Sequence, residues 1–211
     1  FMGESEKRRH WKIYREKIKF CYCVLPGILL QGKYSEPYFF NPTVIYKLLK
    51  SSPEIIIVSG YAQPSSFLAL LYAKLFRKRL ILWCESNKND QRYNHPLKEI
   101  YKRWFVKNCT QYLVPGRASF EYLTSLGAQE SKIYTAVNAV DNDFFTDACD
   151  KNIGNRDVFK QSKGYPEKII LYVGRLIEEK GIIDLLKAFQ LLSCNYRNLG
   201  LVLIGSGEGE E

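Results

Sequence analysis

One stretch of the sequence, residues 168–207, constrains the fold most strongly, because a strand, a helix and a second strand follow one another in it. Lys168–Val173 is a short apolar run with several β-branched residues, which is typical of a strand. From Ile182 to Leu192 the apolar residues recur at intervals of three and four, which places them on one face of a helix. The apolar run Leu201–Ile204 predicts the next strand. This order of elements predicts a β-α-β unit with parallel strands.

Two cations, Arg175 and Lys180, lie in the predicted turn between the first of these strands and the helix. Such a turn lies at the carboxyl end of a parallel strand, where open α/β sheets bind their ligands. Arg binds phosphate oxygens through a planar fork, Lys binds them as a point charge, and the helix N-terminus adds unpaired N–H groups. We therefore interpret this loop as a site for a phosphorylated ligand. The spacing alone leaves open a surface turn whose two cations are only solvated.

The identity and order of the residues in this stretch are more specific than the spacing of the two cations. In order along the chain, it contains Val173-Gly-Arg175, Glu178-Glu-Lys-Gly181, the helix that follows and the strand that ends in Gly205-Ser-Gly207. Over residues 168–208 it resembles the nucleotide-sugar domain of the GT-B glycosyltransferases of family 4. The resemblance implies that Arg175 and Lys180 bind the donor diphosphate, and that Gly174, Gly205, Ser206 and Gly207 lie against the donor substrate.

The same resemblance implies an activity. It is retaining transfer of a sugar from a nucleotide-diphosphate sugar to an acceptor hydroxyl, in polysaccharide or glycolipid synthesis. The expected partners are the nucleotide-sugar donor and a saccharide or lipid-linked acceptor. No cofactor and no metal are expected, because Arg and Lys replace the metal at the diphosphate. The six cysteines also form no CxxC pair or zinc pattern.

Strand and helix patterns alternate through the first part of the chain as well, which predicts a doubly wound α/β fold. We expect a Rossmann-like N-terminal domain with a parallel sheet over residues 1–146. A polar linker and the beginning of a second Rossmann-like domain follow over residues 147–211. The expected strands of the first domain are 18–25, 54–59, 79–84 and 111–114, and the expected helices are 42–50, 67–76, 96–108 and 118–126. The continuous apolar run of the second strand predicts burial on both faces.

A few polar residues stand beside these elements. Glu85 follows the strand 79–84, where it either orients an acceptor hydroxyl or caps the next turn, and the sequence does not choose between the two. Asn41 is the expected N-cap of the helix that opens at Pro42. For Asn138 and Asp141 turn capping is favoured over contact with a ligand.

The net charge of +9 is unevenly distributed, because residues 1–110 hold 20 Lys and Arg against 8 Asp and Glu. The resulting +12 indicates an anionic partner such as membrane headgroups or a lipid-linked phosphate, unless the cations only solvate helix faces. No RNA-binding motif accompanies them, so nucleic acid is not an expected partner. No apolar run approaches the roughly 20 residues of a membrane span. We expect a cytoplasmic protein, peripheral on the inner face of the membrane.

The resemblance also implies segments that the sequence does not show. Family members have a Gly-rich loop after an N-terminal strand, and a pair of glutamates beyond the residues that match Gly205–Gly207. We therefore expect a fragment of a longer enzyme, inactive by itself. Two other functions remain open, a nucleotide-sugar epimerase of GT-B fold and a non-catalytic basic adaptor at the membrane.

Overall fold

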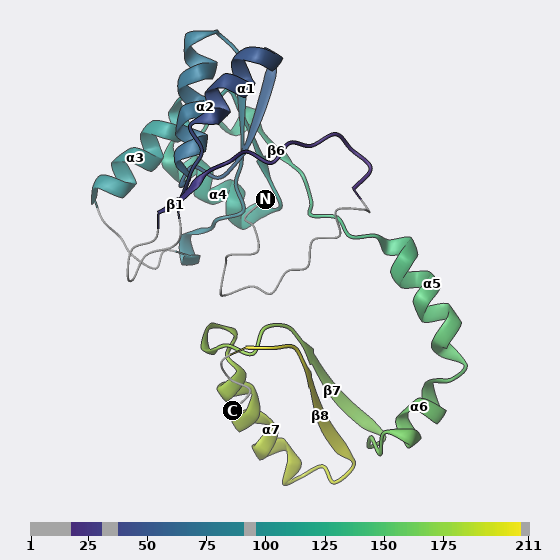
Figure 1. The fold of residues 1–211 in the computed structure, drawn as a ribbon. Helices are drawn as coiled ribbons and strands as arrows, with labels where there is room; N and C mark the ends of the chain where they lie inside the picture. The colour runs from purple at the N-terminus through teal and green to yellow at the C-terminus, as the bar shows by residue number, and fades with distance from the viewer. Residues whose placement is uncertain (1–17, 31–37, 91–95, 208–211) are drawn as a thin grey trace. The chain divides into compact units, whose positions relative to one another are not determined.

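The computed structural model describes residues 18–30, 38–90 and 96–207 (Figure 1). The chain forms two compact units, Phe1–Ala139 and Val140–Glu211. The two units meet between Ala139 and Val140, so the whole of helix α5 (Asn142–Ile153) belongs to the second unit. The boundary expected after residue 146 would fall inside this helix.

The first unit is built on a four-stranded parallel sheet of order β3-β4-β5-β6, and β1 and β2 form a separate antiparallel pair. The expected α/β class with a parallel sheet is therefore confirmed. The elements of the first unit, with η marking a short 3-10 helix, are β1 (Ile28–Leu30), β2 (Tyr38–Phe40), α1 (Thr43–Ser51), β3 (Ile55–Ser59), α2 (Pro64–Leu75), β4 (Arg79–Trp83), η2 (Lys88–Asp90), α3 (Pro96–Lys107), β5 (Gln111–Val114), α4 (Arg117–Leu126), η3 (Glu130–Lys132) and β6 (Ile133–Thr135).

The described helices bury one face of this sheet. Along β3, Ile56 and Val58 are buried, whereas Ile55 and Ile57 are 43% and 56% exposed. The expectation that this strand is buried on both faces is therefore wrong for the described residues. The reason is topological, since the strands follow one another in one direction across the sheet. Right-handed crossovers then place α2, α3 and α4 on the same side.

The core of the first unit lies between the covered sheet face and these helices. Register pairs Ile56 with Leu80 and Val58 with Leu82, so the buried positions form rows across the sheet. The largest fully buried side chains include Tyr122, from α4. Because the same residues that alternate along the strands fill this core, the period-two pattern of the sequence is explained by one buried face.

Two local predictions for the first unit are wrong. Residues 18–27 contain no strand, and Ile18–Leu25 has no hydrogen-bonded neighbour strand among the described residues, without which a strand is not formed. Asn41 does not cap α1 through its side chain. Its amide instead donates to the Pro26 carbonyl (3.1 Å), and a Cβ on Gly27 would overlap that amide. Asn41 therefore ties the preceding segment to the start of α1.

The second unit consists of α5, α6 (Arg156–Ser162), β7 (Lys168–Val173), η4 (Glu178–Lys180), α7 (Ile182–Ser193) and β8 (Leu199–Ile204). The polar linker expected over 147–167 is thus largely helical. Asp141 caps α5 by accepting from the Phe144 N–H at 3.0 Å, which confirms the capping interpretation. Among the described residues of this unit, Leu176 and Ile182 are the buried apolar side chains. The second unit therefore has a much smaller core than the first.

No helix in the described ranges is long and apolar enough to cross a membrane.

Candidate functional site

The candidate site of the second unit is the pair of loops that follow β7 and β8. The two strands are parallel and in register from Lys168 with Leu199 to Val173 with Ile204. Backbone pairing continues past the strand ends, because the Gly174 N–H donates to the Ile204 carbonyl and the Leu176 N–H donates to the Ser206 carbonyl, both at 2.9 Å. The two loops therefore leave the sheet side by side, as extensions of the strands.

The glycines of these loops are required by their mutual contact. A Cβ on Gly205 would lie 1.7 Å from the Gly174 carbonyl oxygen, and a Cβ on Gly207 would lie 2.1 Å from the Leu176 carbonyl oxygen. Gly174 is less restricted, since its Cβ would meet the Tyr172 hydroxyl at 2.8 Å. The structure thus gives the Gly-x-Gly pattern a reason within the chain. Contact of Gly174, Gly205, Ser206 and Gly207 with a donor stays a prediction.

The two predicted cations lie on the same loop. Arg175 is half-buried directly after β7, and its carbonyl accepts a hydrogen bond from the Tyr172 hydroxyl at 2.9 Å. Lys180 is exposed at the end of η4. The ion pairs recorded among the described residues all lie within α3 and α4, so neither cation is neutralised by one of them. As far as the described residues go, both side chains are available to an anion.

The helix that follows the loop, α7, adds less positive potential to the site than a helix N-terminus usually does. Gly181 is the N-cap of α7 in the left-handed conformation, with φ of 68°, so the chain turns sharply from the loop into the helix. The first turn of α7 carries Asp184, whose carboxylate offsets part of the positive helix end. A phosphate at this loop would therefore depend on Arg175 and Lys180 more than on the helix dipole.

Glu85 lies in the first unit, at the carboxyl edge of its sheet, as the sequence predicted. The ladder extends past β4, since the Cys84 N–H donates to the Leu113 carbonyl at 2.9 Å. The Glu85 carbonyl accepts from the hydroxyl of Ser119, a buried residue of α4, at 3.1 Å, whereas the residue as a whole is exposed. The backbone at Glu85 is therefore fixed and its carboxylate faces solvent.

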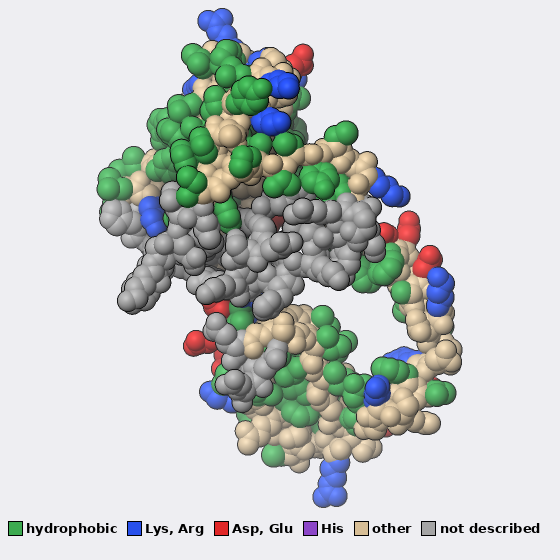
Figure 2. Space-filling model, in the orientation of Figure 1, with side chains coloured by type: hydrophobic (Ala, Val, Ile, Leu, Met, Phe, Trp, Pro, Cys, Tyr) green, Lys and Arg blue, Asp and Glu red, His purple; other side chains and the backbone are tan. Residues whose placement is uncertain are grey.

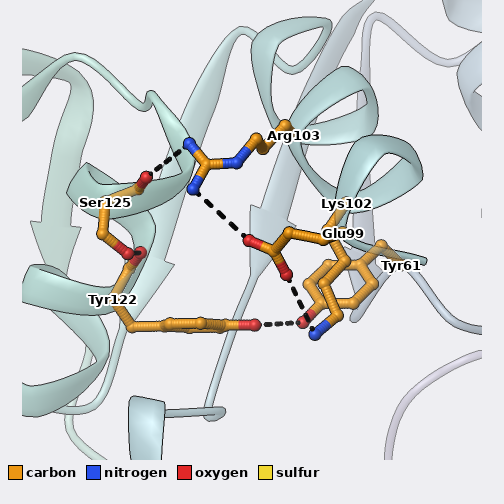
Figure 3. Close-up of polar contacts among 6 residues, drawn as sticks. All are labelled: Tyr61, Glu99, Lys102, Arg103, Tyr122 and Ser125. Carbon is orange, nitrogen blue, oxygen red and sulfur yellow. Dashed lines mark hydrogen bonds and ion pairs between the residues drawn. The ribbon is translucent and has the colours of Figure 1, made fainter. Parts of the chain in front are cut away.

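Beside this edge lies a tyrosine pair that sequence reasoning missed. The hydroxyls of Tyr61, just after β3, and Tyr122, in α4, lie 3.1 Å apart (Figure 3). The Tyr101 hydroxyl donates to the Tyr61 carbonyl at 3.0 Å. Burial, and secondly the hydrogen bond with Tyr122, raise the pKa of Tyr61 above its usual value. Tyr61 therefore keeps its proton, and its hydrogen bonds link the turn after β3 to α3 and α4.

Ionic contacts support the same corner (Figure 3). Glu99 of α3 pairs with Lys102 at 3.6 Å and with Arg103 at 3.5 Å, and Arg103 donates to the Ser125 carbonyl of α4 at 2.8 Å. Only the position of Tyr61 after a strand could have been noticed in the sequence. Tyr101 and Tyr122 lie inside helices, where nothing in the pattern distinguishes them from core aromatics.

No group of His, Cys, Asp or Glu in the described parts of the chain is arranged to hold a metal ion.

Comparison with known proteins gives one family match and several solved structures of similar fold. Residues 155–211 match the family model described as glycosyl transferases group 1. The crystal structure of HepE from Anabaena in complex with UDP and glucose is similar in fold, with 14% identity and a TM-score of 0.53 over 77% of this chain and 43% of that one. The structure of HepE with UDP-glucose has 15% identity and a TM-score of 0.53 over 79% of this chain and 44% of that one. The UDP-N-acetylglucosamine 2-epimerase of Rickettsia bellii is more distant (17%, 0.43, 78% and 42%). A search of curated proteins gave no significant match.

The chain thus spans less than half the length of these structures. It has the GT-B fold, and its second unit carries the match to the glycosyl transferases group 1 family.

Proposed function

We propose that this chain belongs to a retaining glycosyltransferase that moves a sugar from a nucleotide-diphosphate sugar to an acceptor hydroxyl in polysaccharide or glycolipid synthesis. The observation that supports it is the loop after β7. This loop carries Arg175 and Lys180, without an ion pair among the described residues, at the carboxyl end of a parallel strand within the family match. HepE, one of the neighbours in fold, was crystallised with UDP-glucose, which makes a UDP-sugar the first donor to try.

The mechanism follows from charge. When the glycosidic bond of the donor breaks, negative charge develops on the leaving diphosphate. Arg175 contacts two of its oxygens at once and Lys180 adds a second positive charge. Groups fixed in advance stabilise a developing charge without having to reorganise, and one such contact contributes about 2.7–4 kcal/mol at the transition state. The acceptor hydroxyl attacks on the face that the diphosphate leaves, and the diphosphate oxygen takes its proton. Glu85 either orients that acceptor or only caps its turn.

The test is made in the complete product of the gene, with UDP-glucose and other nucleotide sugars as donors. Arg175→Ala and Lys180→Ala should each lower kcat by about 100-fold or more. Arg175→Lys should also lower it, because a point charge cannot make the bidentate contact. A matched control is Lys187→Ala, which removes an exposed cation from α7, away from the loop.

Near-normal turnover in both alanine variants would reject the role of the loop. Isomerisation of the donor sugar without any acceptor would indicate the epimerase instead. We further place the protein in the cytoplasm, at the inner face of the membrane, where a lipid-linked acceptor is reached.

A further inference from the structure

Helix α2 has a composition that its surroundings do not explain. Its 12 residues include a single charged side chain, Lys74, so it is apolar on all sides. A helix of that kind is normally covered on all sides. Ala69, Leu70 and Tyr72 do face the core, but Leu71 and Leu75 on the other side are 44% and 76% exposed.

Helix α3 presents a second apolar stripe. Its buried side carries Phe105 and Val106, whereas Leu97, Ile100 and Trp104 are 69%, 63% and 43% exposed. The spacing of three and four places these three on one face of the helix. The face is therefore apolar and turned to solvent along two turns.

The two stripes meet. The ring of Phe67, one turn before Leu71 on α2, lies 6.1 Å from the ring of Trp104. We call the joined surface the α2/α3 face, made of Phe67, Leu71, Leu75, Leu97, Ile100 and Trp104. Figure 2 shows hydrophobic side chains gathered over the region where α2 and α3 lie in Figure 1. A contiguous apolar surface rimmed by polar residues is typical of a site of interaction.

The charges around the face indicate what covers it. Helices α2 and α3 carry five Lys and Arg residues and one acidic residue, Glu99, which is already paired with Lys102 and Arg103. Lys74, Lys98 and Lys107 are exposed on the same two helices. Apolar side chains, a Trp and surrounding cations are the composition of helices that lie in the interface of an anionic membrane.

We propose that the α2/α3 face docks the protein on an anionic lipid surface, with the apolar stripes inserted at the headgroup level and the cations on the headgroups. This inference specifies how the proposed membrane-side location would be achieved. It does not depend on glycosyl transfer, so it can hold or fail independently of that activity.

The experiment measures binding of the whole chain to vesicles of phosphatidylcholine mixed with phosphatidylglycerol, and to vesicles of phosphatidylcholine alone. Binding should favour the anionic vesicles and weaken as salt rises. The double variant Leu71→Gln/Leu75→Gln should bind the anionic vesicles at least about tenfold more weakly than the parent, because polar side chains do not enter the membrane interface. The control Leu191→Gln changes a side chain that is 73% exposed on α7, close to the 76% of Leu75, and should bind as the parent does.

Two further measurements keep the result independent of folding. Circular dichroism and thermal unfolding should be the same for the double variant and its control. In the parent chain, tryptophan emission should shift to the blue on adding anionic vesicles, and Trp104→Phe should remove most of that shift. Equal binding of parent and double variant, or equal binding to both kinds of vesicle, would overturn the proposal. So would a dimer that Leu75→Gln separates and that binds no vesicles, since the face would then contact a second copy.

Discussion

Gly205 is the residue of the second unit at which an added Cβ would come nearest to the backbone of the neighbouring loop. Any side chain there would overlap the Gly174 carbonyl, and a backbone atom cannot move aside cheaply. We expect Gly205→Ala to destabilise the second unit by about 1–3 kcal/mol, the usual cost of inserting an atom into a packed region. Chemical unfolding, monitored through the NMR amide signals of β7 and β8, measures this loss of stability.

Gly154 provides the matched control in the same unit. It has a φ of −66° and no atom within 4 Å of an added Cβ. Gly154→Ala should therefore leave the stability unchanged, or raise it by about 0.4–1 kcal/mol through the lower entropy of the unfolded chain. If both variants lose the same stability, the close contact of the loops is not what requires Gly205.

Two buried groups of the first unit make its stability depend on alkaline pH. Burial raises the pKa of the Cys109 thiol from 9.0 to about 12 and that of the Tyr112 hydroxyl from 10.0 to about 12. The folded state keeps both protons while the unfolded state loses them. The stabilisation is therefore complete below pH 9.0 and is lost as pH rises towards 12.

We expect urea unfolding of the first unit to show a smaller free energy of unfolding at about pH 11 than at neutral pH. In Cys109→Ala the decrease should be smaller, because the contribution of the buried Cys109 thiol is removed. An equal free energy at both pH values in the parent chain would contradict the burial of these groups.

At the scale of elements, α5 depends on its first turn. Asp141 caps the N-terminus of this helix by accepting from the Phe144 N–H. All described residues of α5 are exposed, so packing adds little to its stability. Asp141→Ala should cost about 1 kcal/mol and lower the helicity of residues 142–153, as measured by chemical shifts.

Asp143 offers the comparison for the cap. It carries the same charge in the first turn of α5 but accepts no bond from the helix backbone. Asp143→Ala should lose about 0.3–1 kcal/mol, which is the contribution of charge alone. Equal losses in the two variants would mean that the hydrogen bond of Asp141 adds nothing.

At the scale of the whole molecule, the two units differ in what protects them. The core cluster lies entirely in the first unit, where β4 is paired on both sides and contains Leu80 and Leu82, exposed by 1% and 0%. The sheet of the second unit has two strands and one crossover helix in the described residues. Hydrogen exchange should therefore be slow at Leu80–Trp83 and faster throughout Lys168–Val173. Equal protection would mean that the second unit has support beyond these elements.

The sequence by itself determined the order and type of most elements. Lys168–Val173 and Gln111–Val114 are strands with the predicted bounds, and α3, α4 and α7 begin or end within one residue of prediction. These predictions agree with the structure because the spacing of apolar residues and the glycines at strand ends follow the local backbone conformation directly. The cations Arg175 and Lys180 could be found for the same reason, since a residue between a strand and a helix has its place at the sheet edge fixed by topology.

Only the tertiary structure decided which surfaces are buried and which distant residues meet. Residues 18–25 have the pattern of a strand but pair with no other strand among the described residues. Strand β3 has the pattern of a fully buried strand, and the described helices cover one of its faces. The tyrosine pair at 61 and 122 and the α2/α3 face join positions far apart in the chain. Pairing, burial and such contacts depend on what the rest of the fold places opposite a residue, which a local pattern does not encode.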